Sequence, residues 1–396
     1  MSERVTVGII GAGPAGLLLG NLLLGAGVDC AIFERHSRAH IERRARAGLI
    51  AHPTVELLTR HGLADRLLAE GMRHTACEFR HQGEYFSVPY SELTGGQAHY
   101  VYPQQFLVRD LVAAFLRAGG TLHFDTACTA LRRLYGPGPA ILCTTGSAET
   151  ARIQCDYLAG CDGQHGISGA ALPPGRARTY RLRHPAGWLA VLAEAPPATT
   201  EIIYGLHRDG FAGHMLRTPQ ISRFYLQCPA GDDPHNWPDE RVWEQLHHRL
   251  ALRDSDWHLN TGPILDKHVL DLRSCVTSPM QYGKLYLVGD AAHVVSPAGA
   301  KGMNLAMADA AALAAGIIDS VHRKNTDLLD RYSALRLPSV WRAQEFSHWL
   351  LQLLHTDLGT GAGADFEQQL RLARLRQLRD SRTCAAAFAE NYVGMP

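Results

Sequence analysis

The sequence predicts an α/β fold in which a parallel-sheet domain is interrupted by an antiparallel-sheet domain and followed by a helical C-terminal region. Three observations support this prediction. A β-branched run at Val5 to Ile10 leads through a glycine-rich turn into an apolar helical stretch. Residues 188–229 alternate between strand-like and turn-like segments. Residues 327–354 and 365–389 have helical patterns.

Composition and charge indicate a soluble, cytoplasmic protein. At 396 residues the chain exceeds the usual size of a single core, so we expect about two or three lobes. The formal net charge of +1 gives no excess of positive charge for binding nucleic acid. The nine cysteines are scattered without C-x-x-C or zinc-like spacing, which predicts reduced thiols and no metal site. The apolar stretch Leu17 to Val28 is too short to span a bilayer, and no signal peptide is expected.

A strand, the glycine turn GAGPAG, a helix and a second strand that ends in an acid open the chain. Gly11 allows the tight turn, Gly13 leaves room for a pyrophosphate, and Gly16 permits close packing of helix on strand. The helix N-terminus, which includes Ala15, offers unpaired N–H groups to phosphates, and Glu34 is placed to bind a ribose hydroxyl. The pattern predicts a Rossmann-like site for a dinucleotide, either FAD or NAD.

An arginine-rich segment, RHSRAHIERRARAG, follows Glu34. It is either a solvated basic loop or a source of further contacts to the dinucleotide. Arg44 and Arg46 are the better candidates for contacts, because they lead into a glycine turn near the phosphate loop. The candidate cofactor-binding residues of this region are Arg44, Arg46, Ala47, Gly48 and Leu49. A further candidate is Gln104, which precedes the predicted helix over 108–118.

The antiparallel segments around residue 210 place polar side chains on shared faces. Side chains alternate between the two faces of a strand. In the first strand Ile202, Tyr204 and Leu206 therefore share a face. The corresponding sets are Gly213, Met215 and Arg217 in the second strand and Arg223, Tyr225 and Gln227 in the third. If these faces coincide, they form a pocket floor suited to a small aromatic acid, with arginine for its carboxylate and tyrosine for a polar group across the ring. An exposed polar face is the alternative.

The segment GDAAHVVSPAGAKGMNLAMADA, residues 289–310, follows another strand-like stretch, at Leu285 to Val288. Ordinary connections in compact domains are shorter and need less special chemistry. The segment is either an idle loop before a capped helix or a loop shaped around a large, flat group.

The motifs GAGPAG, CDG, GDAAH and KGMNLA, in this order, resemble those of the group A flavoprotein aromatic monooxygenases. Within that group the sequence is similar to the 4-hydroxybenzoate 3-hydroxylase family. The similarity extends over essentially the whole chain and includes RARAG, YLAGCDGQHGIS, GWLA, IIYG, SRFYLQ and AENYVG. It implies an NAD(P)H-dependent enzyme that hydroxylates an aromatic acid ortho to a phenol, using O2 and a flavin C4a-hydroperoxide.

The resemblance also implies residue roles at the flavin. Asp290 would bind the ribityl chain of FAD, and the amides of Met303 and Asn304 would lie near the pyrimidine edge. The helix that starts there would direct its dipole at the N1–C2=O locus. Arg223 would influence the movement of the flavin between two positions.

Further roles implied by the resemblance concern the substrate. Tyr204 would bind the phenol, Tyr392 would extend this link, and His74 would complete a proton relay to solvent. These groups would stabilise a phenolate, helped by the positive potential of Arg217, Arg223 and Lys301. By the same resemblance the carbonyl of Pro297 would contact the phenol, and Arg217 with Tyr225 would bind the carboxylate. His165 and Arg273 would contact NADPH or NADH.

Several positions depart from the family pattern. Met215 replaces a serine at the carboxylate end, and Gly213 replaces a leucine, so we expect a larger pocket. His214 and Ala298 also differ, and His40 and Gly169 leave the choice between NADPH and NADH open. A modified substrate such as 3-amino-4-hydroxybenzoate is therefore the alternative to 4-hydroxybenzoate, and a non-catalytic flavin-binding redox sensor is a second alternative. Related enzymes are commonly dimers, so a homodimer is expected.

Domain boundaries follow from these segments. We expect residues 1–72, 100–175 and 268–345 to form the FAD-binding domain, and residues 73–99 and 176–267 to form the substrate-binding sheet domain. Residues 346–396 would form the helical C-terminal region.

Overall fold

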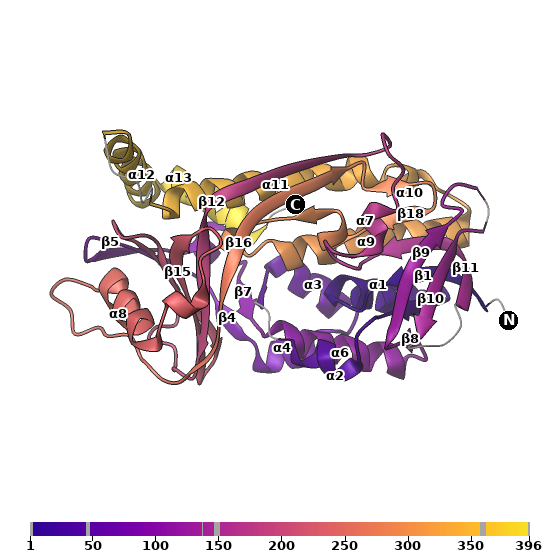
Figure 1. The fold of residues 1–396 in the computed structure, drawn as a ribbon, viewed down its shortest axis with the longest axis horizontal. Coiled ribbons are helices and arrows are strands. Elements are labelled where there is room, and N and C mark those ends of the chain that lie inside the picture. The colour runs from indigo at the N-terminus through magenta and orange to yellow at the C-terminus, as the bar shows by residue number, and fades with distance from the viewer. Residues whose placement is uncertain (1–2, 45–47, 137, 146–150, 357–361, 395–396) are drawn as a thin grey trace.

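The computed structural model describes residues 3–44, 48–136, 138–145, 151–356 and 362–394. These residues form β-sheets flanked by helices, and the predicted α/β fold is confirmed. Figure 1 shows two lobes: a sheet near the N-terminus and another at the opposite end, with strands β12 and β16 running between them.

The first sheet contains the predicted parallel strands. Its order is β17-β18-β11-β1-β2-β8, and β10 and β9 continue from β11. Strand β1 pairs in parallel with both β2 and β11, which places the glycine turn at the carboxyl end of a central strand. The bounds are β1 Glu3–Ile10, β2 Cys30–Phe33, β8 Thr121–His123, β9 Thr126–Arg132, β10 Ala140–Thr145, β11 Ala151–Gly160, β17 Gln281–Tyr282 and β18 Leu285–Leu287.

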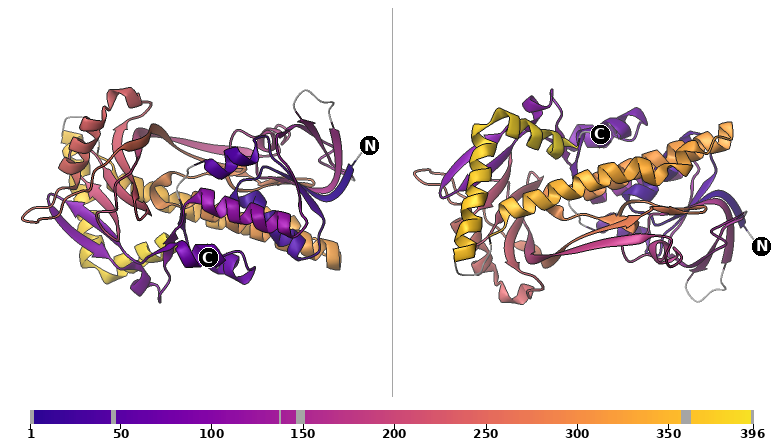
Figure 2. Two further views of the ribbon diagram at one scale, coloured as in Figure 1. Left: turned by 90° about the horizontal axis from the view of Figure 1, so that it is seen from below. Right: turned by 90° about the horizontal axis from the view of Figure 1, so that it is seen from above.

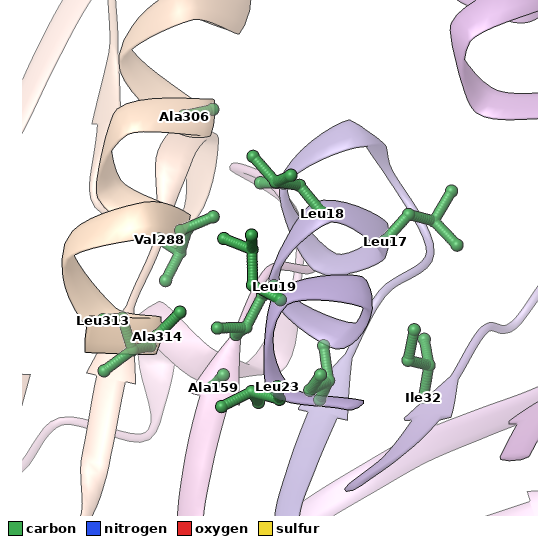
Figure 3. Close-up of a cluster of buried hydrophobic side chains, with 14 of the residues drawn as sticks. Leu17, Leu18, Leu19, Leu23, Ile32, Ala159, Val288, Ala306, Leu313 and Ala314 are labelled. Atoms are coloured by element: carbon green, nitrogen blue, oxygen red, sulfur yellow. The ribbon is translucent and has the colours of Figure 1, made fainter. Parts of the chain in front are cut away.

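Helices α1 (Pro14–Gly25) and α9 (Gly302–Arg323) pack together against this sheet. In Figure 3, Leu18, Leu19 and Leu23 of α1 face Ala306, Leu313 and Ala314 of α9 across Val288. The apolar run after the glycine turn is therefore a core helix. The other helices of this lobe are α2 Arg38–Arg43, α3 His52–Arg60, α4 Asp65–Glu70, α6 Gln104–Arg117 and α7 Ile167–Ala170.

The second sheet has the order β19-β16-β12-β15-β14-β13-β5-β6. It contains the predicted antiparallel meander, which β12 and β16 extend on one side and β5 and β6 on the other. Helix α8 (Asp239–Leu250) packs on one face. The bounds are β5 Cys77–His81, β6 Glu84–Val88, β12 Arg178–Ala193, β13 Ile202–Leu206, β14 Ala212–Thr218, β15 Ile221–Pro229, β16 Ile264–Ser278 and β19 His293–Val294.

Small elements connect the lobes. Strands β3 (Leu49–Ile50), β7 (His99–Val101) and β4 (Met72–His74) form a small sheet, and α5 is Tyr90–Leu93. Short helical turns occur at η1 Pro234–Asn236, η2 Gly289–Ala291 and η3 Pro297–Gly299.

The C-terminal region is helical, as predicted. Its helices are α10 Asp327–Asp330, α11 Tyr332–Leu354, α12 Ala362–Asp380 and α13 Arg382–Val393. Figure 2 shows that α11 runs along most of the molecule and that α12 crosses its end. Among the described helices, α9 has the length and composition of a membrane span, and 56% of its apolar window is buried inside the protein.

The elements cross several of the predicted domain boundaries. The boundary at 72/73 falls inside β4, the one at 267/268 inside β16, and the one at 345/346 inside α11. The second sheet also includes β19, which belongs to the segment after the first sheet resumes. The division into domains stays a prediction.

A buried carboxylate joins the two lobes. Asp309 of α9 is fully buried and accepts hydrogen bonds from the amide of Gly289 (3.1 Å) and from Nε of Arg336 on α11 (2.8 Å). Its Oδ2 also lies 2.6 Å from Nε2 of His293 on β19. Burial raises the pKa of Asp309, but the charges and hydrogen bonds of His293 and Arg336 together outweigh it and hold this pKa below its usual value.

We expect Asp309→Ala to lower the free energy of unfolding by about 3–5 kcal/mol, because it leaves Arg336 and the Gly289 amide buried without their partner. Urea denaturation followed by circular dichroism measures this change.

Asp319→Ala on the same helix is the matched control. Among the described residues Asp319 forms an ion pair only with the largely exposed Arg323, so its loss is expected to cost less than about 1 kcal/mol. Equal destabilisation by the two substitutions would contradict the role given to Asp309.

Candidate active site

The glycine turn between β1 and α1 leaves an open cradle. Gly11 has φ +101°, and a Cβ there would lie 2.5 Å from the carbonyl oxygen of Cys161. A Cβ on Gly16 would lie 2.1 Å from the carbonyl oxygen of Gly11, whereas one on Gly13 would meet nothing within 4 Å. Helix α1 has no side-chain cap, so the first amides, including that of Ala15, are available to an anion. The turn fits a pyrophosphate.

Glu34 shapes this cradle. It is buried, and its two carboxylate oxygens accept the amides of Ala12 and His36, each at 2.9 Å. The carboxylate therefore fixes the turn, and its remaining lone pairs are the ones that could accept a ribose hydroxyl.

The other predicted cofactor residues border the same lobe. Arg44 directly follows α2 as its C-cap, and Gln104 begins α6. Gly48 lies so close to Tyr102 that a Cβ would be 2.0 Å from its carbonyl oxygen. Leu49 begins β3. Arg46 and Ala47 lie outside the described residues.

The segment between β18 and α9 has the form of a shaped loop. Asp290 lies in η2, directly after Gly289, whose amide Asp309 holds. Asn304 fixes strand β3: its amide group donates to the carbonyl of Leu49 (3.0 Å), and its oxygen accepts the amide of Ala51 (2.9 Å). Pro297 is exposed at this loop.

Helix α9 begins in this loop without a side-chain cap, so its first amides, with Met303 beside Asn304, face outward from the helix end. An uncapped helix N-terminus stabilises negative charge placed beyond it. Together with the open cradle at Gly13, these features fit FAD.

The predicted pocket face is present in the second sheet. Tyr204 on β13 pairs in register with Gly213 on β14, and Gly213 pairs with Tyr225 on β15. Directly paired residues of adjacent strands lie on the same face of a sheet. Met215 pairs with Arg223 in the same way, so the predicted faces coincide.

Gly213 does not enlarge the pocket, and that expectation is wrong. A Cβ at Gly213 would lie 2.8 Å from Cζ of Phe211 and 3.5 Å from Cε of Met215. Phe211 is fully buried, and its ring contacts Trp188 with ring centroids 4.8 Å apart. The ring of Phe211 therefore takes the space that a larger side chain at 213 would need.

One end of this face is cationic. Arg217 and Arg223 are both buried, with 5% and 6% of their surfaces exposed. Nη2 of Arg217 donates to Gln105 (3.3 Å), and Nε of Arg223 is buried without a hydrogen-bond partner in the described residues. Burial, and then the charge of Arg223, lower the pKa of Arg217 to about 10. Two buried guanidinium groups in proximity favour a bound carboxylate.

The other end is phenolic. The hydroxyl of Tyr204 lies 3.1 Å from that of Tyr392 on α13, and both residues are buried. Burial raises the pKa of both tyrosines well above the usual value. They therefore stay protonated, and one hydroxyl proton is free to be donated to a ligand.

His74 contacts this end through another tyrosine. Its Nε2 accepts the amide of Ile202 at 2.7 Å, so Nδ1 carries the proton and donates to the hydroxyl of Tyr90 at 2.8 Å. The hydroxyl of Tyr90 donates to the carbonyl of His74, and its ring centroid lies 5.0 Å from that of Tyr392. His74 is 2% exposed, and burial lowers its pKa to about 4. His74 is thus neutral and enclosed, and its part in a relay to solvent stays a prediction.

Lys301 and His99 complete the surroundings of Tyr392. The ammonium group of Lys301 donates to the carbonyl of Tyr392, and the ring of His99 lies edge-on to the tyrosine ring at 5.1 Å. Burial, and then the charge of Arg342, lower the pKa of Lys301 to about 7.

The predicted nicotinamide residues lie on separate elements. His165 is exposed in the loop after β11, and Arg273 is half-buried on β16, in register with Arg183. No contact joins the two in the described residues, and their role stays a prediction.

Sequence reasoning missed several residues of the site. Phe211 and Trp188 lie on the pocket face, and Trp188 donates to Nε2 of His355 at 2.6 Å. Tyr90 and His99 lie beside Tyr392. Aromatic residues within buried runs carry no local signal of a site, since most such residues are core.

A group of potential metal ligands is also present in the described residues, although the sequence predicted no metal site. His207, Asp209 and His248 have ligand atoms within 4.8 Å of one another at the surface. Asp209 and His248 form an ordinary surface pair at 2.9 Å, so we assign no metal to them.

Comparison with known proteins identifies relatives of the whole chain. The chain is 38% identical over 393 residues to p-hydroxybenzoate hydroxylase of Acinetobacter baylyi, covering 99% of this chain and 96% of that protein. It is 28% identical over 354 residues to 3-amino-4-hydroxybenzoate 2-monooxygenase PtmB3 of Streptomyces platensis, covering 86% of each.

Solved structures share the fold. The crystal structure of p-nitrophenol 4-monooxygenase from Pseudomonas putida DLL-E4 superposes with a TM-score of 0.84 over all of both chains, at 17% identity. Residues 4–347 match the family described as FAD binding domain. By this match and the near full-length identity, the chain belongs to the FAD-binding aromatic hydroxylases and is a flavin-dependent monooxygenase.

Proposed function

We propose that the protein hydroxylates 4-hydroxybenzoate ortho to its phenol, consuming one O2 and one NAD(P)H and releasing water. The observation that carries this proposal is the row Tyr204–Gly213–Tyr225, which has buried arginines at one end and the Tyr204–Tyr392 pair at the other. A ligand with a carboxylate and a para phenol matches both ends. The 38% identity to p-hydroxybenzoate hydroxylase supports the same substrate.

When bound, FAD supplies the redox chemistry that moves electrons from NAD(P)H to O2. The residues of this chain orient and ionise the substrate. Arg217, with Tyr225 beside it, would hold the carboxylate, and Arg223 would add a second positive charge. Tyr204 would donate to the phenol oxygen and so favour the phenolate, whose ring carbon ortho to the oxygen is the more nucleophilic.

Proton release is the second task. Tyr204 can pass a proton to Tyr392 over 3.1 Å. The next hydroxyl along the aromatic cluster is that of Tyr90, whose ring lies beside that of Tyr392 and whose hydroxyl is hydrogen-bonded to His74. Because Nε2 of His74 accepts the Ile202 amide and Nδ1 carries a proton, His74 would have to release that amide to accept the proton. We propose this route, with the Pro297 carbonyl as a further partner of the phenol and Lys301 as a nearby positive charge.

Three further properties are proposed from the sequence. They are a cytoplasmic location, a homodimer, and the use of His165 and Arg273 for the nicotinamide dinucleotide. A modified substrate such as 3-amino-4-hydroxybenzoate has less support, because the more distant relatives act on it and Phe211 closes the space at Gly213.

A screen of phenolic acids tests the substrate. We expect 4-hydroxybenzoate to stimulate NAD(P)H oxidation with stoichiometric 3,4-dihydroxybenzoate, measured with NADH and NADPH in parallel by absorbance and chromatography. Tight coupling with 3-amino-4-hydroxybenzoate alone would assign the modified substrate instead. Peroxide without product for every acid would contradict both assignments.

Tyr204→Phe tests the phenolate role. It keeps the ring but removes the donor, so we expect flavin binding to be retained and product formed per NAD(P)H oxidised to fall sharply, with peroxide in its place. Tyr85→Phe, on the same sheet but 62% exposed, is the control and should stay coupled. Full coupling in Tyr204→Phe would overturn the role.

Met215→Ser tests the carboxylate end. Because Met215 pairs with Arg223, a hydroxyl there can donate to the substrate carboxylate, and a hydrogen bond to a charged group contributes about 1.5–3 kcal/mol. We expect 4-hydroxybenzoate to bind about tenfold more tightly or better, measured by its perturbation of the flavin spectrum. Met215→Ala removes the thioether without adding a donor, and equal affinity in both variants would contradict the placement.

A further inference from the structure

A cavity of about 190 Å³ lies between α3, the start of α9, α11 and the end of α13. Its wall includes Asn304, whose side chain is fixed to β3, but none of Tyr204, Arg217, Tyr225 or the glycine turn. A cavity of roughly 150 Å³ is enough to bind a benzene ring. The space is thus sufficient for one substituted aromatic ring and is separate from the pocket of the second sheet.

Its wall is cationic. Lys301, Arg336 and Arg342 line the cavity, and no Asp or Glu does so among the described residues. Lys301 is 5% exposed, donates to the carbonyl of Tyr392, and has no carboxylate within 4 Å in the described part of the chain. Nη2 of Arg336 is buried without a partner there, although its Nε binds Asp309. Arg336 is thus already paired with Asp309, whereas Lys301 is a buried cation without a carboxylate partner in the described residues, and such a cation is costly unless an anion joins it.

The rest of the wall is apolar. Leu57, Leu305, Ala343 and Phe346 contribute to it from three helices. Phe346 already lies under the ammonium group of Lys301, which is 5.4 Å from its ring centroid. An inorganic anion would leave this apolar surface unused, whereas a ring that carries a carboxylate would use both kinds of wall.

We propose that this cavity binds a small aromatic carboxylate, with its carboxylate facing Lys301 and Arg336 and its ring against Leu57, Leu305 and Phe346. The proposal does not depend on which acid is hydroxylated. The site is a second one for this class of ligand, in addition to the pocket at Tyr204.

The cavity is linked to the active site through Lys301. Its ammonium group binds the carbonyl of Tyr392, whose hydroxyl is paired with Tyr204. A carboxylate beside Lys301 would neutralise part of the positive potential at this pair. Occupancy is therefore expected to alter the ionisation of a phenol bound at Tyr204, which is the behaviour of an effector site.

Calorimetric titration of the FAD-loaded protein with benzoate tests the proposal. We expect two sites in the unaltered protein and one in Ser339→Leu or Ala308→Leu, which fill the cavity from α11 and α9. Ala334→Leu and Ala315→Leu are matched controls on exposed positions of the same helices and should keep two sites. Two filling variants are used because either one alone could fold poorly.

Crystals of the FAD-loaded protein soaked with 4-iodobenzoate locate the second molecule by its anomalous signal. Iodine in the cavity together with loss of one calorimetric site on filling supports the proposal. A single calorimetric site in the unaltered protein overturns it, as does a second site that the filling variants leave unchanged. A cavity signal in crystals alone, without a second site in solution, also overturns it.

Discussion

The buried carboxylate of Asp309 is the group on which the relative placement of the two halves of the site depends. It accepts the amide of Gly289 at the start of the loop between β18 and α9. It also binds the imidazole of His293 on the second sheet and the guanidinium group of Arg336 on α11. An ion taken out of water costs several kcal/mol unless its partners satisfy it, and here both oxygens are engaged. The carboxylate is therefore stable only when η2, β19, α9 and α11 are all in place.

Helix α9, which contains Asp309, also positions residues of the candidate site. Because Asp309 fixes α9, the residues at its first turn are held where they can act: Asn304 binds strand β3, and Lys301 binds the C-terminal segment at Tyr392. The uncapped end of the helix lies in the loop between β18 and α9. One helix thus holds both strand β3 and Tyr392 in place relative to the loop in which the helix begins.

Local sequence rules were sufficient for part of this arrangement. The glycine turn could be predicted because Gly11 and Gly16 have backbone demands that only glycine meets, and strand alternation correctly placed Tyr204 and Tyr225 on one face. Long-range packing lay beyond those rules. Nothing local indicates that β5 pairs with β13, that Phe211 fills the space at Gly213, or that Tyr90 separates His74 from Tyr392. The first and third depend on residues far apart in sequence, and the second depends on Trp188, whose ring packs against that of Phe211.

The positive charges of the site favour a bound anionic ligand, because the tyrosines of the protein do not ionise to supply a negative charge. Burial keeps Tyr204 and Tyr392 protonated, so neither can neutralise Arg217 or Arg223. In the proposed complex a substrate carboxylate would offset the arginines at one end, which would leave the hydroxyl pair and Lys301 to act on the phenol at the other. Since donors and a positive charge stabilise a phenolate more than a phenol, the pKa of the bound substrate should fall. The enclosed aromatic cluster strengthens this effect, because water that would screen it is excluded.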